Sequence, residues 1–209
     1  MSIVQIVCLL AMLPFVFDAL RRSGIEKAKV DDVLIWAGLT ALVFGILLLA
    51  RDMPEGISLK YSGAAFLALT VGYCRALLSM TLLLLITQPW ADMGLILLID
   101  ALLPTWLMLS VVRLTRRYLP ANPFVFMLGC GFFGLFIVYA VQQSAGVFFP
   151  AVLTGEPALG LLFSEQTGLR LLLAGGEATL EGMIITILVV YFPRAVLLFD
   201  DDYYLSRPM

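Results

Sequence analysis

Four ionisable residues lie in stretches that are otherwise apolar: Asp100, Glu177, Glu181 and Arg75. The two glutamates are four residues apart, so on a helix they share one face. A charged side chain at the centre of a bilayer costs about 2.5–3.5 kcal/mol on insertion scales, and such residues usually face the interior of a bundle. Carboxylate oxygens suit protons or hard cations such as Mg²⁺ and Mn²⁺. The three acids are therefore candidates for binding a substrate or an ion, and Arg75 is a candidate counter-charge within the membrane.

A structural interpretation stands beside each of these roles. Glu177 and Glu181 could instead bond to neighbouring helices and hold a bundle together. Asp100 precedes Pro104 on one predicted helix and could accept bonds that a kink sets free. Arg75 could extend its charged end to the inner membrane surface.

The composition indicates which class of protein must position these residues. Of the 209 residues, 62% are hydrophobic and only 13% are charged, against about 45–50% and about 25% in soluble domains. No stretch between the apolar runs is long enough to fold alone. We therefore predict an all-α, polytopic membrane helical bundle that forms a single transmembrane domain over residues 1–209.

Several function classes lack their usual residues. The chain has no histidine, and its three cysteines are isolated in apolar runs. There is no cofactor fingerprint, no nucleophile with an adjacent base, and no basic and aromatic surface for nucleic acid. We predict a protein that is not an enzyme, has no cofactor or metal site, and binds no nucleic acid.

About seven spans are expected. They are approximately Ile3–Leu20, Val33–Ala50, Tyr61–Val71, Ala76–Thr87, Met93–Val112, a segment from Pro120–Pro123 to Val141, and Leu169–Tyr191. The run Tyr61–Thr87 is divided at Gly72–Arg75, and one tilted helix is the alternative. Gln142–Thr167 is expected as a semi-polar connection at the membrane interface, and the C-terminal tail as an interfacial segment.

Basic residues give the orientation. With the N-terminus outside and the C-terminus inside, ten of the 13 Lys and Arg residues fall on the inner side, as the positive-inside rule expects. Six glycines are predicted to let helices approach closely. These are Gly129, Gly131, Gly134, Gly175, Gly176 and Gly182.

Three stretches resemble a known family. They are GISLKYSGAAFLALTVGYCRALL, LPANPFVFMLGCGFFG and GGEATLEGMIITILVVYFPRAVLLFDDDYYL. They are similar to the permeases of energy-coupling-factor transporters, the CbiM-type membrane subunit of cobalt and nickel uptake, in a divergent proteobacterial branch. The resemblance covers about Pro54 to Tyr204 and implies a seven-helix bundle with an external N-terminus, in the bacterial inner membrane.

The chain departs from this family at the metal site. The family uses the N-terminal amine and two histidines, whereas this chain begins Met1-Ser2-Ile3 and has Lys60 near the second histidine position. An ammonium group does not ligate a metal ion.

Two functions therefore remain open. The first is a transport subunit whose partners are membrane lipid, a coupling membrane protein and ATPase subunits, since the chain has no nucleotide-binding loop of its own. The second is a structural or assembly subunit of a larger membrane complex that reuses the fold.

Overall fold

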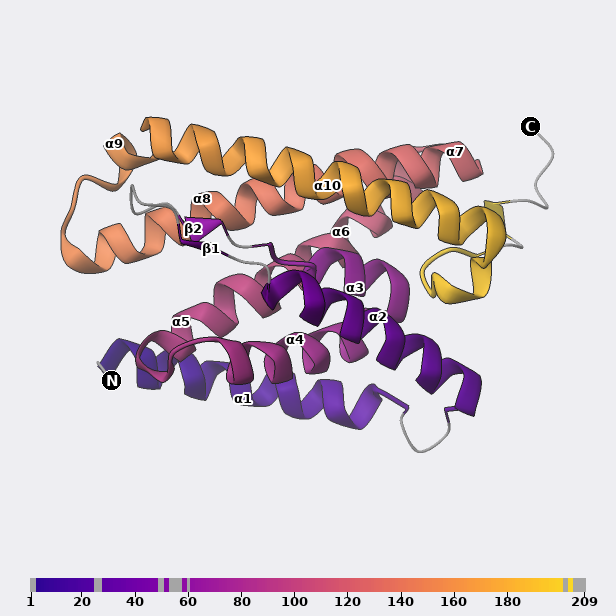
Figure 1. Ribbon diagram of the computed structural model, residues 1–209, viewed down its shortest axis with the longest axis horizontal. Helices are drawn as coiled ribbons and strands as arrows, with labels where there is room; N and C mark the ends of the chain where they lie inside the picture. The colour runs from indigo at the N-terminus through magenta and orange to yellow at the C-terminus, as the bar shows by residue number, and fades with distance from the viewer. Residues whose placement is uncertain are drawn as a thin grey trace.

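The computed structural model describes residues 3–24, 28–48, 51–52, 58–59, 61–200 and 203–204, with only the backbone for residues 51–52 and 58–59. Most of this chain is helical (Figure 1). The elements up to Ile96 are α1 (Ile3–Arg22), α2 (Val30–Leu48), β1 (Arg51–Asp52), β2 (Ser58–Leu59), α3 (Ala64–Val71), α4 (Tyr73–Thr87), η2 (Trp90–Asp92) and α5 (Met93–Ile96). Those that follow are η3 (Leu97–Leu102), α6 (Leu103–Tyr118), α7 (Pro123–Val125), η4 (Phe126–Gly134), α8 (Leu135–Thr154), α9 (Ala158–Leu162), α10 (Glu165–Tyr191) and η5 (Pro193–Ala195). The two short strands form one antiparallel pair.

Several elements continue one another and form long helices. The segment Trp90–Tyr118 is 29 residues long and includes the π-helical η3, and Pro123–Thr154 is 32 residues long and includes the π-helical η4. With α1, α2 and α10, these make five helices in the described chain that are long and apolar enough to cross a membrane. The arrangement indicates a multi-pass helical membrane protein.

The predicted division of Tyr61–Thr87 into two helices is confirmed. Gly72, with φ 82°, separates α3 from α4, and this backbone conformation favours glycine. The second helix begins at Tyr73, three residues earlier than predicted. With eight and 15 residues, the two helices are about 12 and 22 Å long, so neither spans a hydrocarbon core of about 30 Å.

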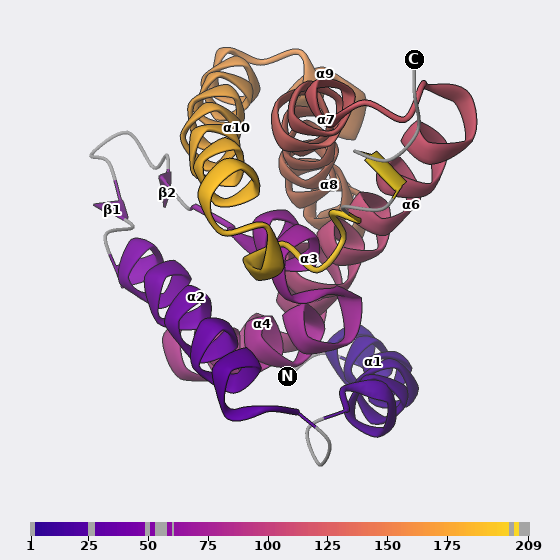
Figure 2. The ribbon, with the colours of Figure 1, turned by 90° about the vertical axis from the view of Figure 1, so that its right-hand side faces the viewer.

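Helix α3 lies at the centre of the bundle. Figure 2 shows it surrounded by α2, α4, α6, α8 and α10, and all eight of its residues are buried. Because the first residues of α3 are buried, their backbone N–H groups need acceptors within the protein. Its last carbonyl groups are covered by the C-terminal segment, where Leu197 N–H donates to Thr70 O at 2.7 Å and Leu198 N–H to Leu69 O at 3.2 Å.

The predicted connection Gln142–Thr167 is wrong. Helix α8 continues to Thr154, α9 follows at Ala158–Leu162, and α10 begins at Glu165. Two glutamines and Pro150 suggested a loop, but a proline is tolerated inside a membrane helix when neighbouring groups satisfy the freed backbone. Residues 142–154 therefore extend into the bundle as helix.

The tail is also more internal than predicted. Phe199 and Tyr204 are buried, and both rings pack edge-on against Phe126, with centroids 5.1 and 5.3 Å away. This contact fastens the chain end to η4. Asp201 and Asp202 of the predicted interfacial tail lie outside the described residues.

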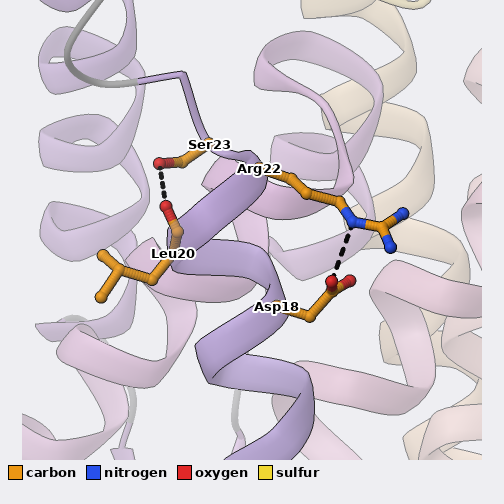
Figure 3. Close-up of polar contacts among 4 residues, drawn as sticks. All are labelled: Asp18, Leu20, Arg22 and Ser23. Atoms are coloured by element: carbon orange, nitrogen blue, oxygen red, sulfur yellow. Dashed lines mark hydrogen bonds and ion pairs between the residues drawn. The ribbon is translucent and has the colours of Figure 1, made fainter.

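The C-terminal end of α1 is stabilised by contacts between residues near in the sequence. Arg22 forms an ion pair with Asp18 at 2.8 Å, and the hydroxyl of Ser23 donates to Leu20 O at 2.8 Å (Figure 3). Gly24, with φ 65°, then turns the chain away, in the left-handed conformation typical of a residue after a helix.

Candidate functional site

A cavity of about 640 Å³, lined by both polar and apolar residues, lies beside the start of α1. The starts of α1 and α10 and the ends of α4 and α8 line it, together with residues of α2, α5 and η3. Its lining includes Asp92, Asp100 and Arg170, and four amide side chains. These are Gln5, Gln88, Gln142 and Gln143. The volume falls in the range of about 300–1,000 Å³ that is usual for small-molecule sites.

Asp100 and Gln142 meet at one side of this cavity. The amide nitrogen Nε2 of Gln142 donates to Asp100 Oδ1 at 2.9 Å. A carboxylate accepts only from the nitrogen of an amide, so the oxygen Oε1 of Gln142 points elsewhere. That oxygen is buried and has no hydrogen-bond partner among the described residues, and the side chain is only 4% exposed. The pair thus presents an unused acceptor beside a carboxylate.

Near the opening, Gln5 connects α1 to the start of the α5 helix. Its amide donates to Asp92 Oδ1 at 3.3 Å, and its carbonyl oxygen accepts from Leu95 N–H at 3.0 Å. A Cβ added to Gly94 would overlap the backbone oxygen of Gln5, so these helices are in close contact. The Gln5 side chain is therefore fixed by its bonds to Asp92 and Leu95.

Glu177 binds the chain segment that leads into α3. Its Oε1 accepts from Ser62 N–H at 2.6 Å and from Gly63 N–H at 2.9 Å. Gly63 has φ 64°, and successive N–H groups in such a turn form a concave site for an anion. The other oxygen, Oε2, is buried and has no partner among the described residues. Because Ser62 also lines the cavity, this carboxylate lies behind the cavity wall.

Glu181 completes the same arrangement one turn further along α10. Its Oε2 accepts from the hydroxyl of Tyr139 at 2.5 Å, and that hydroxyl oxygen accepts from Phe66 N–H at 3.3 Å. Phe66 is the third residue of α3, where a helix has no internal acceptor for its N–H. The two glutamates and Tyr139 therefore supply acceptors for the buried beginning of α3, as the structural interpretation of these acids expects.

The three candidate acids do not form one cation site. Glu177 accepts from Ser62 N–H just before α3, and Glu181 accepts from the Tyr139 hydroxyl. Asp100 lies in η3 and accepts from the amide nitrogen of Gln142. Within the described chain, no group of three Asp, Glu, His or Cys residues is placed to hold a metal ion.

Arg75 does not act as a counter-charge to these acids. Its Nε donates to Ser23 O at 3.1 Å, and its guanidinium lies over the ring of Trp36, 5.6 Å from the centroid. It forms no ion pair with an acid in the part of the chain that the structure describes. The bend after Gly72 places it beside the end of α1, away from α10.

The predicted packing glycines differ among themselves. A Cβ on Gly182 would lie 2.6 Å from the backbone oxygen of Gly131, and one on Gly134 would lie 2.9 Å from a methyl group of Val111. Gly129 and Gly175 have ordinary contacts at 3.6 Å. The prediction is wrong for Gly176, which is exposed and would place a Cβ in open space.

Sequence reasoning missed several cavity residues. Gln142 and Gln143 fell in a predicted connection, and Arg170 was not named as a candidate. The signal available was the pair of adjacent glutamines, which are the first polar residues after the long apolar run of η4 and early α8. Polar side chains in a spanning segment usually face the interior or a pathway.

No family model matches the chain, and neither a curated protein nor a solved structure is significantly similar to it. The contacts described above are therefore the basis for any assignment of function.

Proposed function

We propose that this chain is a multi-span membrane subunit that binds a small polar solute in its cavity and works with partner subunits to transport it. The observation that carries this proposal is the Gln142 oxygen, which is buried in the lining of a cavity between apolar helices and has no hydrogen-bond partner among the described residues. Polar groups in a membrane bundle are costly and commonly mark the path of a substrate. A buried acceptor without a partner is also costly, and a bound solute would remove that cost.

The proposed topology has seven passages, with the N-terminus outside and the C-terminus inside the bacterial inner membrane. In Figure 1 the start of α1 and the end of α10 lie at opposite ends of the bundle, as an odd number of passages requires. The α3–α4 pair supplies one inward and one outward passage, with α3 starting inside the bundle. Arginines at the ends of α1 and α6 support the orientation through the positive-inside rule. The cavity would then open to the outside.

Resemblance to the CbiM-type permeases supports the same class of function. It suggests a coupling membrane protein and ATPase subunits as partners, since ATP hydrolysis must come from other chains. Without the family's histidines, cobalt and nickel are not the proposed cargo. An organic solute fits the amide-rich lining better, since amides and carboxylates bind hydrogen-bond donors.

A second function is favoured by a different observation. Glu177 accepts from the backbone N–H groups of Ser62 and Gly63, and Glu181 accepts from the Tyr139 hydroxyl, whose oxygen accepts from Phe66 N–H. Both glutamates thus support the start of α3, which is what a structural bundle needs. In that case the chain would be a structural or assembly subunit of a larger membrane complex.

Gentle purification of the tagged chain from its native membrane, followed by mass spectrometry of the co-purifying subunits, tests the proposal. Recovery of an ATPase pair with a coupling membrane protein, in a fixed ratio to this chain, is the expected result. Recovery within a respiratory, photosynthetic or oxygenase complex, without an ATPase, would overturn transport and favour the structural role.

A further inference from the structure

We propose that the cavity is selective for an extended zwitterionic solute, with its protonated amine at Asp100 and Gln142 and its carboxylate at Arg170. This inference rests on the proposed function, because it specifies the class of solute that the same cavity binds. Two buried atoms of the cavity lining, Gln142 Oε1 on α8 and Arg170 Nε on α10, have no hydrogen-bond partner among the described residues.

The end of the cavity at Asp100 is suited to a cationic donor. Gln142 Oε1 is an acceptor with no partner in the part of the chain that the structure describes, and the Asp100 carboxylate, which accepts from the Gln142 amide nitrogen, lies next to it. Glu177 adds a further carboxylate behind the wall at Ser62. A protonated amine has three donors and no acceptor, so it can bond to Gln142 while its charge is balanced by Asp100.

Arg170 gives another part of the lining the opposite character. Its Nε is buried and has no hydrogen-bond partner among the described residues, and no described acid pairs with the side chain. Asp92, the other acid of the lining, is bonded to Gln5. A guanidinium with an unused donor is the usual partner of a carboxylate group.

The helical register separates the two ends. Tyr139 on α8 bonds to Glu181 on α10, and the two helices run in opposite directions (Figure 1). From that bond, Gln142 is three residues toward the cavity opening and Arg170 is eleven residues in the same direction. The difference of eight residues corresponds to about 12 Å between the two backbone positions.

Charge placement then distinguishes three solutes of equal length. A diamine would place an ammonium group against Arg170, and a dicarboxylate would place a carboxylate against Asp100. Only a solute with one group of each sign meets an opposite charge at both ends. A single metal ion is too small to reach both.

The test is calorimetric binding to the purified, detergent-solubilised chain with three probes: 6-aminohexanoate, 1,6-diaminohexane and adipate. We expect 6-aminohexanoate to bind about tenfold or more tightly than either of the others, because each of the others places a like charge against one end of the cavity. Arg170→Gln should remove this advantage over the diamine, and Asp100→Asn should remove the advantage over adipate.

Two glycines provide a matched control. Gly146 lines the cavity and Gly168 does not, and a Cβ at either position meets no atom within 4 Å. Gly146→Leu should abolish binding, whereas Gly168→Leu should leave it unchanged. Thermal melting of each variant shows that the chain is folded.

Equal binding of the three probes, tightest binding of adipate or of the diamine, or no binding of 6-aminohexanoate to the folded chain would overturn the inference. These outcomes are separate from the purification experiment. A chain that co-purifies with ATPases but ignores 6-aminohexanoate would keep the proposed function and lose this inference. A chain that binds 6-aminohexanoate as expected but purifies within an unrelated complex would keep the inferred solute class and lose the proposed transport function.

Discussion

Helices α2 and α3 are both strongly apolar, yet they lie in opposite environments. In α2, Val43 is the one buried residue, whereas in α3 the most exposed residue, Val71, is only 4% exposed. Hydropathy therefore identifies segments that tolerate a membrane but does not tell which of them contact lipid. The difference lies in the position of the two helices, because α3 is surrounded by α2, α4, α6, α8 and α10 (Figure 2), whereas α2 has only one buried residue.

The polar bonds of the two helices differ in the same way. Helix α2 is attached through side chains, with Trp36 Nε1 donating to Ser79 Oγ at 2.7 Å and Thr40 Oγ1 lying 3.0 Å from the same oxygen. Helix α3 is attached through the backbone at both ends, by residues far away in the sequence. A short helix inside a membrane domain needs such bonds because its terminal backbone groups cannot reach water.

The largest expected effect comes from removing the acceptor at the start of α3. Glu177→Leu leaves the N–H groups of Ser62 and Gly63 buried without a partner, so we expect the free energy of unfolding to fall by about 3 kcal/mol. Glu177→Gln keeps an oxygen acceptor and should lose about 1 kcal/mol. Unfolding in mixed micelles with increasing SDS measures both. Equal losses for the two variants would mean that this acceptor does not stabilise α3.

A matched pair of enlarged alanines compares the two environments directly. Ala68→Leu in α3 should destabilise the protein by about 1–3 kcal/mol, because the surrounding core has no room for the added atoms. Ala37→Leu in α2, an exposed position, should change the stability by less than about 0.5 kcal/mol. The same unfolding assay applies. Similar effects at the two positions would contradict the distinction between buried and exposed helices.

Tyr139→Phe should have a smaller effect. It removes the hydroxyl that joins Glu181 to Phe66 N–H, at a cost of about 1–2 kcal/mol. A double-mutant cycle with Glu181→Gln should show a coupling free energy of about 1 kcal/mol. Additive losses would indicate that the tyrosine and the glutamate act independently of each other.

The smallest effect is expected at Ser79. Ser79→Ala removes the shared partner of Trp36 and Thr40 and should cost about 1 kcal/mol. Because α2 has few other buried contacts, its amides should exchange with deuterium faster, while those of α3 remain protected. Equal acceleration in both helices would show that α2 does not loosen separately.

Part of this arrangement is predictable from the sequence for clear physical reasons. Gly72 was recognised as a break because glycine readily interrupts an apolar helix, and Glu177 and Glu181 were expected to face the interior because a carboxylate in lipid is costly. The burial of α3 was not predictable, since its composition equally suits a lipid-facing helix. Gln142 was missed because Pro150 and nearby polar residues resemble a loop.

The tail was missed for a similar reason. The sequence FPRAVLLF suits an interfacial segment and a buried one alike, and the bonds that decide between them are made by backbone atoms. A pattern of side chains does not report bonds between the N–H of Leu197 and the carbonyl of Thr70.

That last bond also sets an order of events during biosynthesis. Leu197 follows Thr70 by 127 residues, so at about 5–20 residues per second the ribosome needs on the order of 10 s to supply the partner of an already synthesised helix. Glu177 arrives almost as late. During this interval the nascent α3 and α4 have unsatisfied polar ends, and a chaperone or the insertion machinery has time to hold them. A chain truncated after α10 would lack the N–H groups that bond to the last carbonyl groups of α3. We therefore expect α3 to pack stably only after the final segment has been synthesised.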